Sequence, residues 1–85
     1  LGAETFHVSR RPGQSHQSQP HDTGVTEEVF VLEGAMEVLR DGSWVPLETG
    51  QGLRFAADQP HGYRSGDRGA AFLNMHHYRR VGTAE

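Results

Sequence analysis

The sequence predicts an all-β domain, and three observations support that prediction. Short apolar runs alternate with turn signals along most of the chain, which is typical of a sandwich or barrel of short strands. Eleven glycines and four prolines divide the 85 residues, and glycine interrupts each run that has helical apolar spacing. The dipeptide Asp41-Gly42 between two apolar runs is a strong signal for a two-residue hairpin. Periodicity alone leaves sandwich, barrel and jelly roll open.

The first half of the chain predicts three strands. Residues 4–10 (ETFHVSR) alternate between polar and apolar side chains and form the first strand. The polar stretch 12–24 contains two prolines and predicts a loop with a short extended piece at most. Residues 27–34 (EEVFVLEG) are rich in β-branched and aromatic side chains and predict a strand that stops at its final glycine. Residues 35–40 (AMEVLR) then lead into the hairpin turn.

The second half predicts four more strands, and the total of seven or eight suits a double-sheet jelly roll. These strands are residues 43–47, 53–56, 61–65 and 70–78. Turns are predicted at 48–52 (ETGQG), 57–60 (ADQP) and 65–69 (SGDRG). Pro46 has no N–H to donate to a ladder, so it indicates an edge strand. The tail 79–85 is expected to fray.

The composition limits both the size of the core and the chemistry of any site. A chain of 85 residues holds one domain, near the lower limit for a single core, and domains this small often gain stability from a metal or a second copy. We therefore expect a homodimer, in which pairing would bury sheet edges and an apolar face. The absence of cysteine excludes disulfides and thiolate ligands, so any metal must be held by nitrogen and oxygen.

Charge and hydropathy exclude two classes of partner. The net charge is −3, lysine is absent, and acidic residues are spread along the chain, so we expect no direct nucleic-acid contact. The arginine pairs at 10–11 and 79–80 are interpreted as solvated surface charge. No apolar run is long enough to cross a membrane, and no signal-peptide pattern is recognisable, so we expect no membrane partner and a cytoplasmic location.

The spacings around His61 carry the functional signal. Six residues separate Glu27 from Gly34, and fifteen separate Gly34 from Gly50. Ten residues then lie between Gly50 and His61, and Ser65 follows His61 after three more. A histidine between a proline and a glycine, as in QPHGYRS, is by itself more often a polar residue at a strand start than a ligand. Whether His61 is a ligand therefore depends on the residues that accompany it at these spacings.

These spacings resemble the two motifs of the cupin family, G-x5-H-x-H-x(3–4)-E-x6-G and G-x5-P-x-G-x2-H-x3-N. The stretch EEVFVLEG is similar to the end of the first motif and GQGLRFAADQPHGYRS to the second, so that the resemblance extends from Phe6 to Tyr78. It implies a small double-stranded β-helix, the jelly-roll barrel of cupins, and it implies that Glu27 and His61 are metal ligands. Ala56, Asp58 and Ser65 depart from the second motif and mainly affect the shape of its turns.

The first motif has only one of its two histidines. With a three-residue gap before Glu27, His21 stands at the first histidine and Thr23 at the second; in the other register His21 is the second histidine and the gap is one residue too long. In either register His21, Glu27 and His61 supply two imidazoles and one carboxylate. That set suits a divalent metal, zinc first, with iron, manganese or nickel as alternatives.

The last strand could supply a fourth ligand. Its two faces are 71, 73, 75, 77 and 70, 72, 74, 76, and the leucine and methionine of the first face favour an inward His77 over His76, although Phe72 favours the opposite. Thr23, Arg54 and Tyr63 are candidates for the wall of a ligand pocket. An inward Arg54 would indicate a ligand that bears a carboxylate.

The residue order also resembles the C-terminal cupin domain of bacterial helix-turn-helix regulators of the XRE type, in which a Pro-His pair, here Pro20-His21, replaces the full histidine pair. The resemblance implies that residues 1–85, with a core at about 4–78, are one cupin domain at the end of a longer chain, and a start at Leu1 agrees with DNA-binding helices ahead of it. The expected function is metal-dependent sensing of a small-molecule effector. A stand-alone dioxygenase or isomerase and a metal-free binding or dimerisation module remain alternatives, and no residue is assigned a catalytic role.

Overall fold

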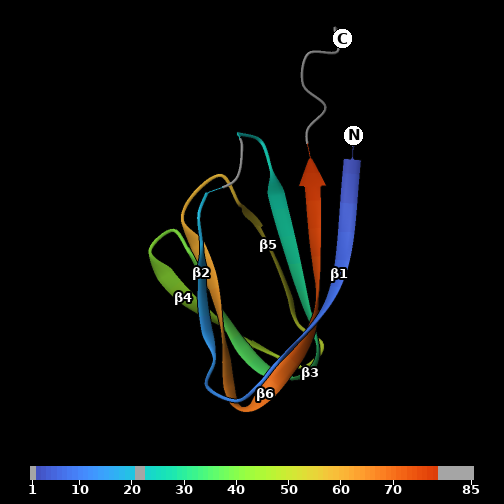
Figure 1. Cartoon of the computed structure of the whole chain (residues 1–85), viewed down its shortest axis with the longest axis vertical. Helices are drawn as coiled ribbons and strands as arrows, with labels where there is room; N and C mark the ends of the chain where they lie inside the picture. The colour runs from blue at the N-terminus through green and yellow to red at the C-terminus, as the bar shows by residue number, and fades with distance from the viewer. Residues whose placement is uncertain (1, 21–22, 79–85) are drawn as a thin grey trace, which may run out of the picture.

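The structure, a computed structural model, describes residues 2–20 and 23–78 and is all-β, as predicted (Figure 1). The six strands are β1 (Gly2–Arg10), β2 (Ser15–Ser18), β3 (Thr26–Arg40), β4 (Ser43–Glu48), β5 (Gly52–Ala56) and β6 (His61–Tyr78). The predicted tail 79–85 lies outside the described residues. In the part of the chain that the structure describes, no helix could span a membrane.

Two long, bent strands organise the fold. The first part of β3 pairs with β5 and with the second part of β6, which pairs in turn with β1. The second part of β3 pairs with β4 and with the first part of β6, which also pairs with β2. All of these pairings are antiparallel. Each half therefore has four strands, and β3 and β6 are shared between the halves and connect them into a barrel (Figure 1).

The structure corrects two predicted strand boundaries. Neither the glycine at position 34 nor the stretch 65–69 ends a strand, so four predicted strands are joined in pairs into β3 and β6. The register between these two strands shifts on both sides of Gly34, where β-bulges bend the ladder without ending it. Gly34 and Gly69 both have positive φ, at 81° and 77°, a conformation that favours glycine.

The bulges also change which residues of β3 point into the barrel: the set of alternate positions that is buried before the bulges differs in parity from the set that is buried after them. Along β3 the buried positions are Glu27, Val29 and Val31 before the bulges, and Met36 and Val38 after them. The interval from Val31 to Met36 is odd, so a single period of two cannot describe the whole strand. This change of parity keeps the apolar side chains inside the barrel on both sides of the bend.

Short turns and an edge strand agree with the sequence prediction. Asp41 and Gly42 form the tight hairpin between β3 and β4, with φ of 49° and 76°. Pro46 lies on β4, which is the outermost strand on its side of the sheet, as predicted. The core is a single apolar cluster inside the barrel: Val25, Val29, Val31, Met36, Val38, Leu47, Phe55, Ala57, Tyr63, Ala70 and Phe72.

Ser65, in the first half of β6, is hydrogen-bonded to the turn that follows β1. Its hydroxyl accepts a hydrogen bond from the Gln14 amide at 3.0 Å and donates one to the Arg11 carbonyl. The Ser65 amide donates to the Gln14 carbonyl at 2.8 Å. The serine that replaces the family's asparagine therefore positions the loop that leads into β2.

Candidate functional site

Glu27 and His61 meet inside the barrel, although they are 34 positions apart in the sequence. Glu27 is the second residue of β3 and His61 is the first residue of β6. Both side chains are 1% exposed, and His61 Nε2 lies 3.1 Å from Glu27 Oε2. Burial of a carboxylate away from water is costly unless the charge is compensated, so these two side chains form the polar centre of the domain.

The His61 ring is oriented by the backbone. Its Nδ1 lies 2.9 Å from the carbonyl oxygen of Gln59, which can only accept a hydrogen bond, so Nδ1 carries the proton. The other ring nitrogen, Nε2, faces Glu27 Oε2. A histidine that donates one N–H to a backbone carbonyl is the usual arrangement of a metal ligand.

His76 approaches the same carboxylate oxygen from the other end of β6. It pairs with Glu27 across the ladder, and its Nε2 lies 3.6 Å from Glu27 Oε2. The Tyr78 hydroxyl donates its hydrogen bond to Glu4 at 2.7 Å and also lies 3.4 Å from His76 Nδ1. Because its proton is already directed at Glu4, the hydroxyl can only accept a hydrogen bond from His76 Nδ1. The hydrogen bond to Glu4 raises the pKa of Tyr78, which keeps this proton on the phenol. His76 Nε2 therefore also presents a lone pair to Glu27.

The prediction that His77 points inward is wrong. Its Nε2 lies 3.6 Å from Glu28 Oε1, on the opposite face of the sheet from Glu27. The inward residues of this strand are Phe72, Asn74 and His76. Leucine and methionine at 73 and 75 misled the parity argument because the outer face is itself half-buried there.

Tyr63 and Asn74 complete the contacts of Glu27. The Tyr63 hydroxyl donates to Glu27 Oε1, and Asn74 Nδ2 lies 3.3 Å from the same oxygen and 2.9 Å from the Tyr63 hydroxyl. Burial raises the pKa of Tyr63, and the hydrogen bond to Glu27 raises it further, so the phenol stays protonated and acts as a donor. The Glu27 carboxylate thus contacts two imidazoles, a phenol and an amide.

A cavity of about 200 Å³ lies against this cluster. Its lining residues are Phe6, Val8, Arg10, His16, Ser18, Glu27, Tyr63, Phe72, Asn74 and His76. The Phe6 and His76 rings are in edge contact, with centroids 5.3 Å apart. The walls are mainly apolar, with a few polar groups that converge, as in a small-molecule site.

The structure places the predicted pocket residues in different locations. Tyr63 lines the cavity, whereas Thr23 and Arg54 are exposed and do not, contrary to expectation. Arg54 pairs with Glu28 across β5 and β3 and points outward, because its neighbours Leu53 and Phe55 point into the core. His21 lies outside the described residues.

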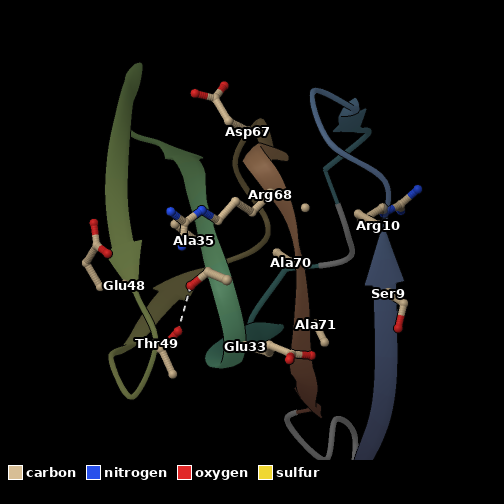
Figure 2. Close-up of a pocket in the computed structure, with 12 residues that line it drawn as sticks. Ser9, Arg10, Glu33, Ala35, Glu48, Thr49, Asp67, Arg68, Ala70 and Ala71 are labelled. Carbon is tan, nitrogen blue, oxygen red and sulfur yellow. Dashed lines mark hydrogen bonds between the residues drawn. The ribbon is translucent and has the colours of Figure 1, made fainter.

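A larger groove of about 800 Å³ shares the lining residue Arg10 with this cavity, and Figure 2 shows its wall. It follows the bulged bends of β3 and β6, where Thr49 Oγ1 donates to the Gly34 carbonyl at 2.8 Å. Its lining includes none of Glu27, His61 and His76. The smaller cavity is the better candidate site, because it alone adjoins the buried polar cluster.

The types of donor at this centre are those that a divalent metal accepts. Two imidazole nitrogens lie near one carboxylate oxygen, and zinc, iron, manganese and nickel all bind nitrogen and oxygen donors of these kinds. Among the described residues, however, no group of three or more His, Asp or Glu side chains is arranged so that it could hold a metal ion. A metal would therefore have to draw the His76 ring closer or recruit a further ligand.

Sequence reasoning missed Arg10, and it set His76 aside in favour of His77. The spacing to Glu27 could not identify them, because they are brought in by ladder pairing and strand parity. The signal for His76 and Asn74 was Phe72, which shares their face and is 1% exposed. Arg10 was grouped with Arg11 as surface charge, yet it follows Phe6 and Val8 at a period of two on one face of β1.

A barrel of this topology with a buried glutamate-histidine centre defines a cupin. The family model for the cupin domain matches residues 6–77, and the chain belongs to this family. It is 40% identical over 78 residues to the helix-turn-helix-type transcriptional regulator SutR of Escherichia coli, covering 91% of this chain and 44% of that protein.

Two solved structures are similar at the same level of identity. The HTH_3 family transcriptional regulator from Vibrio cholerae superposes with a TM-score of 0.90 at 40% identity, covering 93% of this chain and 44% of that one. The Cupin_2 domain of an XRE family transcriptional regulator from Enterobacter cloacae gives 0.88 at 40% identity, covering 92% and 83%. The chain thus spans under half the length of the full regulators that it matches.

Proposed function

We propose that this chain is the effector-binding domain of a helix-turn-helix transcriptional regulator, and that it binds a small molecule in the barrel beside a divalent metal. The observation that carries the proposal is the buried convergence of His61 and His76 on the Glu27 carboxylate at the wall of a cavity. The 40% identity to proteins named as transcriptional regulators supports the regulatory role.

In this proposal the cupin domain itself makes no contact with DNA. A net charge of −3 and the absence of lysine oppose binding to a polyanion, so another part of the polypeptide would supply the DNA contact. Occupancy of the barrel would bias that part. The proposed location of such a regulator is the cytoplasm.

The metal ligands of the proposal are Glu27, His61 and His76, with His21 as a fourth if the loop before β3 reaches the site. Zinc is the first choice, and iron, manganese and nickel suit the same donors. A bound metal would compensate the two Nε2 lone pairs and the carboxylate, and it would leave coordination positions open towards the cavity.

The matched pair His76→Ala and His77→Ala tests the metal proposal. We expect His76→Ala to weaken zinc binding at least about 10-fold, because a ligand is lost, and His77→Ala to change it by less than about two-fold. Zinc affinity is measured by competition with a chromogenic chelator, and circular dichroism confirms that both variants fold. Equal zinc affinity of the two variants would contradict the assignment of His76.

A second copy of the chain is the proposed partner of the outer face of β3. Phe30 and Leu32 are 39% and 41% exposed and share that face, and the sheet also has unpaired edges. A symmetric dimer would bury these side chains.

We expect Leu32→Glu to shift the chain from dimer to monomer in light scattering coupled to size-exclusion chromatography. Gln59→Glu, which adds the same charge at another exposed position, should leave the dimer intact. A wild-type chain that is monomeric at high concentration would contradict the proposed dimer.

A further inference from the structure

Two residues that line the cavity each have one buried side-chain atom without a hydrogen-bond partner in the described residues: Arg10 Nε and Asn74 Oδ1. Arg10 is the last residue of β1 and Asn74 lies near the end of β6, and both line the cavity beside the glutamate-histidine cluster. A buried donor or acceptor without a partner is costly, so such groups in a cavity indicate the polar groups of a ligand.

Arg10 is a cation that the described residues leave without an ion pair. The nearby carboxylate of Glu27 is engaged by Tyr63, Asn74 and the two imidazoles. Arg10 also lines the larger groove, and in Figure 2 its side chain extends away from Glu33 and Arg68, two of the other charged residues that line it. The positive charge of Arg10 lowers the pKa of Tyr63, against the larger effects of burial and of Glu27, which raise that pKa.

The side-chain amide of Asn74 uses its Nδ2 group as a donor, whereas its Oδ1 atom has no hydrogen-bond partner in the described residues. Its Nδ2 donates to Glu27 and to the Tyr63 oxygen, whose own proton is directed at Glu27. This network determines the orientation of the amide, so Oδ1 is an acceptor that requires a donor from elsewhere.

We infer that the effector is a small carboxylic acid that also carries a hydroxyl or amino group, with its carboxylate on Arg10 and its donor on Asn74 Oδ1. The guanidinium is suited to a carboxylate because it can donate two parallel hydrogen bonds. A cavity of about 200 Å³ restricts the acid to a few carbons, and Phe6, Val8 and Phe72 provide an apolar wall for its chain. The inference rests on the proposed function and specifies the ligand class of the same site.

The experiment compares matched probes by isothermal titration of the zinc-loaded 85-residue chain. The probes are butanoate carrying a hydroxyl at position 2 or at position 4, the corresponding amides without the charge, and butanoate without the hydroxyl. We expect at least one hydroxy acid to bind about 10-fold or more tightly than its amide and more tightly than butanoate, since a charge-assisted hydrogen bond is lost in the first comparison.

The variants Arg10→Gln and Arg11→Gln form a matched pair, because Arg11 is the exposed neighbour. Arg10→Gln should weaken binding of the acid about 10- to 100-fold and abolish the preference for acid over amide, whereas Arg11→Gln should change the affinity less than about two-fold. In the absence of probe, Arg10→Gln should unfold at the same or a higher temperature, because it removes a buried Nε donor that has no partner from a half-buried side chain.

Three results of the binding experiments would overturn the inference. They are equal binding of acids and amides, an unchanged preference in Arg10→Gln, and binding of none of the acids. A large loss of thermal stability in Arg10→Gln would also overturn it, because the arginine would then be structural. Zinc affinity of the wild type is measured in the same preparations, so a chain that binds zinc but no acid disproves this inference alone, and a chain that binds neither disproves the metal proposal as well.

Discussion

Glu27→Gln is expected to reduce zinc affinity on the order of 100-fold or more while the barrel stays folded. Glutamine has the same shape, so its amide oxygen can still accept from Tyr63 and Asn74. Its NH₂ group replaces the anionic oxygen that faces the two imidazoles, and it would donate to their Nε2 lone pairs instead of binding a cation.

Glu28→Gln is the control for that substitution. Glu28 is adjacent in sequence and lies on the outer face beside His77, so its replacement should leave the zinc content at the wild-type level. Zinc is measured by mass spectrometry after dialysis, and the melting temperature is recorded with and without added zinc. A metal ion that binds only the folded state raises stability by about 2.7 kcal/mol at 100 times its dissociation constant, so the wild type and Glu28→Gln should show the shift and Glu27→Gln should not. Equal zinc content of Glu27→Gln and Glu28→Gln would disprove the site.

Gly34→Ala is expected to be the most destabilising small substitution on β3. Alanine at this φ of 81° is strained by about 1–2 kcal/mol, and its Cβ would in addition collide with the carbonyl oxygen of Gly69 in the facing bulge. Backbone cannot move aside cheaply at a bend that both halves of the barrel share. We therefore expect a loss of about 3 kcal/mol or more in the free energy of unfolding, measured in urea.

Gly50→Ala separates the two contributions. Gly50 has a similar φ of 87°, but a Cβ there would meet nothing within 4 Å. Its replacement should therefore cost only the strain, about 1–2 kcal/mol. If the two alanine variants unfold at the same urea concentration, the close contact between the two bulges is not what requires glycine at position 34.

The same two glycines show how much could be predicted from the spacing of residues in the sequence. The counts from Glu27 to Gly34 and from Gly50 to His61 predicted the cupin family, and the family is confirmed. In the structure, both glycines have positive φ, one at a bulge and one at a turn. The spacing of the glycines therefore reflects backbone conformations that only glycine adopts readily. For that reason the family could be recognised from the sequence without coordinates.

The site was predictable where spacing determined it and unpredictable where packing did. Glu27 and His61 were named from the sequence, and the structure brings them within 3.1 Å of each other. The choice of His77 over His76 failed because both faces of β6 carry apolar side chains, so alternation could not identify the inner one. Arg10 was interpreted as half of a surface arginine pair, without regard to the face of β1 that it shares with Phe6 and Val8.

By itself the sequence determined the class of fold, the Asp41-Gly42 hairpin, the edge position of Pro46 and the two central residues of the candidate site. These features depend on local propensity or on glycines at fixed distances, which are properties of short stretches of chain. Only the tertiary structure decided that β3 and β6 are continuous and that His76, Asn74 and Arg10 face the cavity. The physical reason is that the bulged segment of β3 changes strand parity once overall, and bulges arise from the pairing of distant segments rather than from the residues that they contain.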